Sequence, residues 1–138
     1  MNIFLDTNVV VDYLACRKDF YDDAAIIFEL INRNLVKAFV SSLTIINCAY
    51  VMRKFFPKEI VLQKIEGILH NIHITSIDED CILKAIKKLP YDFEDAVQYE
   101  SSQTAAPSII ISRDQKGFRD LNAIVMTPKE FISHCREA

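Results

Sequence analysis

The stretch NIFLDTNVVV, residues 2–11, decides the fold of this chain. Its apolar first half predicts a short strand that ends at Leu5, and the carboxylate of Asp6, the hydroxyl of Thr7 and the amide of Asn8 follow directly. A helix is expected after these polar residues. Open parallel sheets place their chemistry where strands pass into helices. Asp6 is therefore either a metal ligand or only the cap of the next helix.

Length and composition indicate one globular domain over residues 1–138, with 51% hydrophobic and 25% charged residues. A chain of this length buries roughly 70% of the surface that it exposes when unfolded. The four cysteines are widely spread and match neither a disulfide framework nor zinc-ligand spacing, so we expect a reducing, cytoplasmic location. The longest uncharged stretch, residues 38–52, is too short and too polar to cross a bilayer, and no membrane association is expected. The net charge of -3 argues against a general nucleic-acid coat protein, so any contact with nucleic acid must be local.

Strands and helices alternate along the rest of the chain. Apolar runs predict strands near residues 37–41, 72–77, 108–112 and 123–126, and 3.6-residue periodicity predicts helices near residues 22–34, 42–55, 58–70, 78–89 and 92–104 and after Pro128. This alternation predicts a parallel sheet covered by helices on both faces, with the functional site at the carboxyl ends of the strands.

Short acidic side chains mark several helix starts. Asp22 or Asp23, Asp78 and Asp92 each stand just before or within the first turn of an expected helix, where a carboxylate can accept a hydrogen bond from a free backbone N–H group. Pro90 ends the helix that Asp78 begins, because proline lacks the N–H group that a helix interior needs.

Three carboxylates fall at strand ends or at the helix start that faces them. Asp6 follows the first strand, Asp95 lies in the first turn after Asp92, and Asp114 follows the strand at residues 108–112. Singly, they could be a helix cap, a charge that complements a helix dipole and a turn residue. Brought within about 4–5 Å, they would repel by roughly 4 kcal/mol per pair at an effective dielectric near 20. A divalent cation relieves such repulsion, and all-oxygen ligands favour Mg²⁺ or Mn²⁺, which can activate water against a phosphodiester.

Four motifs occur in order along the chain: LDTN at residues 5–8, DFEDA at 92–96 with Gln98, ISRD at 111–114 with Phe118, and TP at 127–128 with Phe131. Together they resemble the PIN-domain family, which includes the VapC-type toxin ribonucleases, over nearly the whole chain. The resemblance implies a three-layer α/β/α sandwich around a parallel sheet of four to five strands. It also implies a Mg²⁺- or Mn²⁺-dependent ribonuclease that cuts single-stranded RNA, frequent homodimers and an antitoxin partner.

The resemblance also implies roles for particular residues. Asp6, Asp95 and Asp114 correspond to the catalytic, metal-binding acids of the family. Thr7 and Asn8 would orient the first of these acids and a water molecule.

The chain departs from the family at the helix after its second strand. Family members usually supply a further acid there, commonly Glu, whereas the corresponding residue here is Asn47, whose amide brings no charge. Asp92 and Glu94 could compensate; Asp92 is better placed, although a helix cap requires the same residue. Gly117 also stands where the family often has an acid just before the Phe.

Four basic residues could bring RNA to so acidic a site. Arg17 and Lys18 follow the first helix, and Arg113 and Lys116 flank Asp114. Their charged groups could hold phosphates, or they could simply be solvated.

Two functions follow from these observations. The first is a metal-dependent endoribonuclease, the toxin of a toxin–antitoxin pair. The alternative is a PIN-like RNA- or protein-binding module whose catalysis is weak or lost, and the missing acid at Asn47 favours it. The chain lacks the acidic pair and the following lysine of a receiver-like phosphoryl acceptor, and Asn8 stands where a haloacid-dehalogenase-type phosphatase needs a second Asp.

Overall fold

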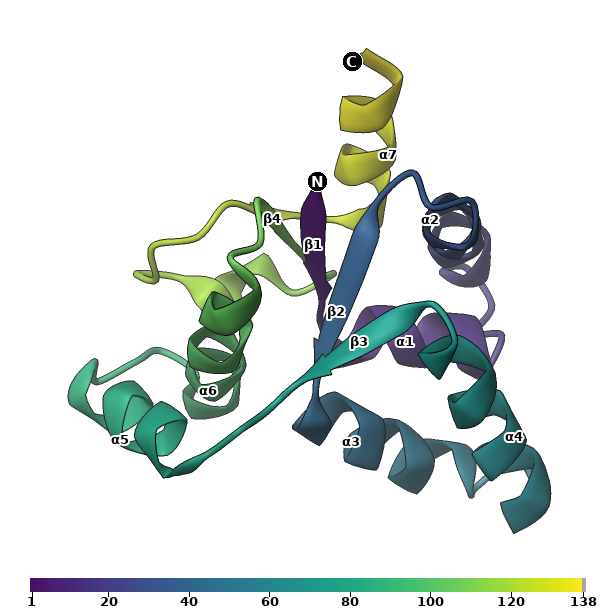
Figure 1. Cartoon of the computed structure of the whole chain (residues 1–138), viewed down its shortest axis with the longest axis horizontal. Helices are drawn as coiled ribbons and strands as arrows, with labels where there is room; N and C mark the ends of the chain where they lie inside the picture. Colours follow the sequence, from purple (N-terminus) through teal and green to yellow (C-terminus); the bar gives the residue numbers. More distant parts are fainter. Residues whose placement is uncertain (138) are drawn as a thin grey trace.

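A computed structural model describes residues 1–137 of the chain. Five parallel strands form one sheet in the order β3-β2-β1-β4-β5, so the first strand lies at its centre (Figure 1). The strands are β1 (Asn2–Leu5), β2 (Lys37–Ser41), β3 (Ile72–Thr75), β4 (Ile109–Ile111) and β5 (Val125–Met126). The register pairs Phe4 of β1 with Phe39 of β2 and with Ile110 of β4. The predicted parallel sheet is confirmed.

Helices cover both faces of the sheet (Figure 1). They are α1 (Thr7–Leu14), α2 (Tyr21–Asn32), α3 (Ser42–Met52), α4 (Lys58–Leu69), α5 (Glu79–Lys87), α6 (Phe93–Ser102) and α7 (Pro128–Glu137), with short 3₁₀ turns η1 (Gln103–Ala105) and η2 (Gln115–Phe118). Successive side chains of a strand point to opposite faces. Ile3 and Leu5 accordingly pack into the large core with α1, α2, α3, α4 and α7, whereas Phe4 packs with Tyr99 of α6 and Phe118 of η2 on the other face. The three-layer α/β/α sandwich is confirmed.

The start of α2 differs from the sequence prediction. Its N-cap is Phe20, which makes no side-chain capping bond, and Asp22 and Asp23 lie inside the first turn. The carboxylate of Asp23 instead pairs with the ammonium of Lys129 on α7 at 3.1 Å. Asp23 therefore forms an ion pair with a residue distant in sequence instead of capping α2. Asp78 and Asp92, in contrast, cap α5 and α6 as predicted.

The carboxyl ends of the two central strands meet at one edge. The backbone N–H of Asp6 donates to the carbonyl of Ile111 at 2.9 Å, which aligns the residues after β1 with those after β4. Residues from the α1 start and from the β4 loop are thereby brought together. Within residues 1–137, no helix is long and apolar enough to cross a membrane.

Candidate metal-binding active site

Asp6 is both a helix cap and the centre of a buried hydrogen-bond network. Its Oδ1 accepts hydrogen bonds from the backbone N–H of Thr7 at 2.8 Å and from Nε2 of Gln98 at 2.9 Å. Its Oδ2 accepts from the hydroxyl of Ser112 at 2.7 Å and from the amide of Asn8 at 3.4 Å. Only 5% of Asp6 is exposed. The network fixes the carboxylate at the strand end rather than leaving it free to rotate.

Ser112 links Asp6 to the loop that carries Asp114. The hydroxyl that donates to Asp6 also accepts the backbone N–H of Asp114 at 3.0 Å. The Oδ1 of Asn8 accepts the backbone N–H of Arg113 at 3.3 Å. Side-chain bonds from Ser112 and Asn8 thus tie the β4 loop to the end of β1.

Gln98 connects Asp6 to the second strand. It is fully buried, and its Oε1 accepts from the hydroxyls of Ser41 at 2.8 Å and Thr44 at 3.0 Å. A carboxylate only accepts hydrogen bonds, so the atom that faces Asp6 must be the amide nitrogen. Thr44 in turn pairs with the hydroxyl of Thr7 at 2.8 Å. Elements far apart in sequence, α1, α3 and α6, therefore converge on one carboxylate.

Asp95 lies one turn into α6, where its backbone N–H donates to Oδ1 of the cap Asp92 at 3.0 Å. Asp95 is 8% exposed, and its carboxylate accepts no hydrogen bond from residues 1–137. Burial, followed by the charges of Asp6, Asp92 and Asp114, raises the pKa of Asp95 to about 8. Burial also raises the pKa of Asp6, although its hydrogen bonds oppose the rise. Both carboxylates therefore lack a compensating positive charge.

Gly117 makes room for the Asp95 carboxylate. A Cβ atom at position 117 would lie 1.6 Å from Oδ2 of Asp95, far inside van der Waals contact. The glycine noted in the sequence as a missing acid is thus the residue against which Asp95 packs. An acid at this position would require Asp95 to move.

One cavity of about 300 Å³ collects the predicted acids. Its lining is Asp6, Thr7, Asn8, Val11, Arg17, Val51, Asp92, Glu94, Asp95 and Asp114. Five carboxylates therefore face one guanidinium. Within residues 1–137, no three His, Cys, Asp or Glu side chains lie close enough together to form a ready metal site. The oxygen-only donor set and the unpaired Asp95 carboxylate nevertheless suit Mg²⁺ or Mn²⁺.

Asp92 and Asn47, two of the residues predicted to support the site, lie in different places. Asp92 lines the cavity and also caps α6. Asn47 is not among the lining residues; its Nδ2 donates to Oε1 of Glu94 at 3.3 Å. The structure thus connects the residue at the missing-acid position to the other acid weighed as its substitute.

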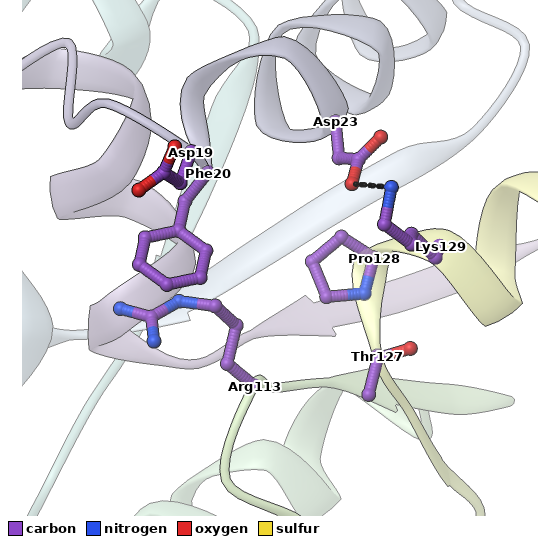
Figure 2. A pocket seen from close by; sticks show the side chains of 7 residues that line it. All are labelled: Asp19, Phe20, Asp23, Arg113, Thr127, Pro128 and Lys129. Atoms are coloured by element: carbon purple, nitrogen blue, oxygen red, sulfur yellow. Dashed lines mark ion pairs between the residues drawn. The ribbon is translucent and has the colours of Figure 1, made fainter.

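The four basic residues predicted to contact RNA lie in different surroundings. Arg17 lines the acidic cavity, whereas Arg113 makes a bidentate ion pair with buried Asp12, at 2.6 and 3.1 Å. The Arg113 guanidinium also lies 3.8 Å from the ring centroid of Phe20 (Figure 2). Its charge is already matched. Lys18 and Lys116 are exposed.

Figure 2 shows a second hollow, on the α7 side of Arg113, of about 320 Å³. Its lining is Asp19, Phe20, Asp23, Arg113, Thr127, Pro128 and Lys129. None of the carboxylates of the first cavity belongs to it. The predicted acids therefore line the first cavity and not this one.

Several of these partners were missed in the sequence, although Gln98 and Ser112 belong to the quoted motifs. Asp12 carries a signal, a lone acid among the apolar residues of a short helix, which is unusual on a buried face. Its partner Arg113 lies 101 residues away, and nothing local identifies it.

The sequence matches the PIN domain family model over residues 2–116, and the chain belongs to this family. The resemblance found in its motifs is confirmed. A comparison with curated proteins found no match.

Solved structures with the same fold include a toxin and toxin–antitoxin complexes. The structure of VapBC2 from Rickettsia felis bound to promoter DNA contains a chain that is 18% identical, with a TM-score of 0.70 and coverage of 92% of this chain and 98% of that chain. A toxin–antitoxin complex from Klebsiella pneumoniae matches at 19% identity, a TM-score of 0.67 and coverage of 91% and 97%. VapC20 from Mycobacterium tuberculosis, a sarcin–ricin loop cleaving toxin, matches at 12% identity, a TM-score of 0.62 and coverage of 78% and 86%. At these identities the likeness shows the fold.

Proposed function

We propose that this PIN-domain protein is a Mg²⁺- or Mn²⁺-dependent endoribonuclease that hydrolyses single-stranded RNA. The observation that carries the proposal is that Asp6, Asp95 and Asp114 all line one cavity at the ends of β1 and β4. A divalent ion, when bound, lowers the pKa of water and neutralises charge on a phosphodiester. The three acids would hold it, because all three line the cavity and two of them are buried without a matching positive charge.

The other residues of the cavity have supporting roles in this proposal. Gln98 and Ser112 each donate to one oxygen of Asp6 and so fix the orientation of its carboxylate at the cavity. Arg17 is the cation of the lining and is the residue placed to meet a phosphate of the substrate. Its ion pair with Asp12, at 3.7 Å, restricts its position without a close hydrogen bond.

A toxin–antitoxin role extends the proposal. The structural neighbours include a VapBC2 assembly and a toxin–antitoxin complex, and an antitoxin partner for this chain is proposed from them. Organisation as one domain, homodimer formation and a cytoplasmic location remain predictions from the sequence.

We expect the purified protein to cut a labelled single-stranded RNA when Mg²⁺ or Mn²⁺ is present and to stop when EDTA removes the ion. Gel separation of the fragments measures the initial rate, and adding the ion back in excess should restore it. The same strand in a full duplex serves as the control for substrate class. Cleavage that persists in EDTA would contradict the metal requirement. Ion binding without any cleavage would support the binding-module alternative.

A further inference from the structure

Glu94 is a cavity acid whose charge is unmatched. It lies in the first turn of α6, directly before Asp95, and lines the same cavity as Asp6 and Asp114. None of the ion pairs formed within residues 1–137 includes Glu94. It therefore belongs to the same set of cavity carboxylates as the three predicted acids.

Asn47 on α3 holds Glu94 from across the cavity edge. The Asn47 amide donates to Oε1 of Glu94 at 3.3 Å, which joins α3 to the start of α6 over 47 residues of sequence. An amide donor orients a carboxylate but brings no positive charge. The second oxygen of Glu94 accepts no hydrogen bond from the residues that the structure describes.

Asp92 is the less suitable of the two additional acids. Its Oδ1 accepts the backbone N–H of Asp95 and closes the first turn of α6, so its orientation is set by the cap. Glu94 has no such duty. In addition, the neighbouring Asp95 carboxylate accepts no hydrogen bond from the residues that the structure describes, so it too is available to a cation.

We propose that Glu94 is a further carboxylate of the ion site and that Asn47 is its positioning residue. Helix α3, residues Ser42–Met52, contains no acid of its own, so the fourth negative charge comes from α6 and α3 supplies only the amide that aims it. The inference rests on the proposed function, because it assigns a role toward the same ion. It exchanges the Asp92 expectation for Glu94.

The test is calorimetric titration of Mn²⁺ into the full chain and its variants. Glu94→Gln keeps the shape and the acceptor for Asn47 but removes the charge, and we expect Mn²⁺ affinity to fall about tenfold or more. Asp92→Asn keeps the cap, since Asn is a good N-cap residue, and we expect only a change of a few-fold. Glu66→Gln, an exposed acid of α4, is the control for net charge and should bind like the wild type. Melting temperatures in EDTA show whether each variant is folded.

Asn47→Ala separates positioning from general electrostatics. This variant keeps every charge, yet it should weaken Mn²⁺ binding, and it should have no further effect when Glu94→Gln is already present. Equal losses in Glu94→Gln and Asp92→Asn, or additive effects of Asn47→Ala and Glu94→Gln, would overturn the inference. If Glu94→Gln binds Mn²⁺ like the wild type while Asp6→Asn loses binding, the role of Glu94 is overturned and the proposed function is not. Failure of the wild type to bind Mn²⁺ would overturn the proposed function as well.

Discussion

Asp6→Asn is expected to reduce divalent-dependent RNA cleavage at least ~100-fold, because loss of the ion's stabilisation of developing charge is worth several kcal/mol. The substitution preserves the N-cap of α1 and one oxygen, so it removes the charge while the helix start is retained. The remaining bonds from Thr7 and Gln98 should keep the side chain in place. The measurement is the initial cleavage rate of a single-stranded RNA in saturating Mn²⁺.

The control for this result is Glu66→Gln, which removes an acid of the same sign from the exposed surface of α4. Its cleavage rate should equal that of the wild type. A rate for Asp6→Asn within a few-fold of the wild type would show that Asp6 is only a helix cap. The metal-ligand interpretation of Asp6 would then be wrong.

Asp95→Asn is expected to change activity and stability in opposite directions. Cleavage should fall by a similar factor, at least ~100-fold, because a proposed ligand is lost. Without divalent ions, however, the variant should be more stable than the wild type at neutral and alkaline pH. The raised pKa of Asp95, about 8, means that the folded protein resists ionisation of a group that ionises freely when the chain unfolds.

The pH profile follows from that shift. Well below pH 3.8, Asp95 is protonated in both states and contributes no difference. As the pH rises from the unfolded value of 3.8 toward about 8, only the unfolded chain loses the proton, and the folded state is progressively destabilised. The stability gain of Asp95→Asn should therefore be smallest at pH 5, grow by up to ~1.4 kcal/mol for each further pH unit and level off above about pH 8, so that it is largest at pH 9.

Thermal unfolding in EDTA at pH 5, 7 and 9 measures this gain. Glu66→Gln should melt with the wild type at each pH. A constant difference between Asp95→Asn and the wild type, or a lower Tm for the variant at pH 9, would contradict the account of a buried carboxylate without a donor. Excess Mn²⁺ should reverse the order, because only the wild type gains stability from the bound ion.

The strands were predictable because each is a short apolar run between polar turns. β1 and β2 fall where the sequence places them, and β4 begins one residue later and ends one residue earlier than expected. β3 ends at Thr75 rather than at residue 77, since pairing with β2 stops at Ser41. Local pattern shows where a strand can form, while its exact end depends on a neighbour that the pattern does not identify.

The positions of the proposed acids in the fold were predictable for the same reason, since Asp6 directly follows β1, Asp114 lies in the loop after β4 and Asp95 lies in the first turn of a capped helix. The hydrogen-bond and ion-pair partners around these acids could not be predicted from the sequence. Gln98 reaches Asp6 across 92 positions and Arg113 reaches Asp12 across 101, and both partners follow from the packing of helices on the sheet. Arg113 is an example: its charge suggested a phosphate contact in the sequence, whereas in the structure its guanidinium pairs with the buried carboxylate of Asp12.

The most direct test of the central claim, that these acids hold one divalent ion, is a crystal structure of the wild-type protein with Mn²⁺ and anomalous data collected for manganese. We predict an anomalous peak inside the cavity, within ligand distance of carboxylate oxygens of Asp6, Asp95 and Asp114. A well-ordered cavity with no peak at millimolar Mn²⁺, or a peak that none of the three carboxylates approaches, would contradict the claim.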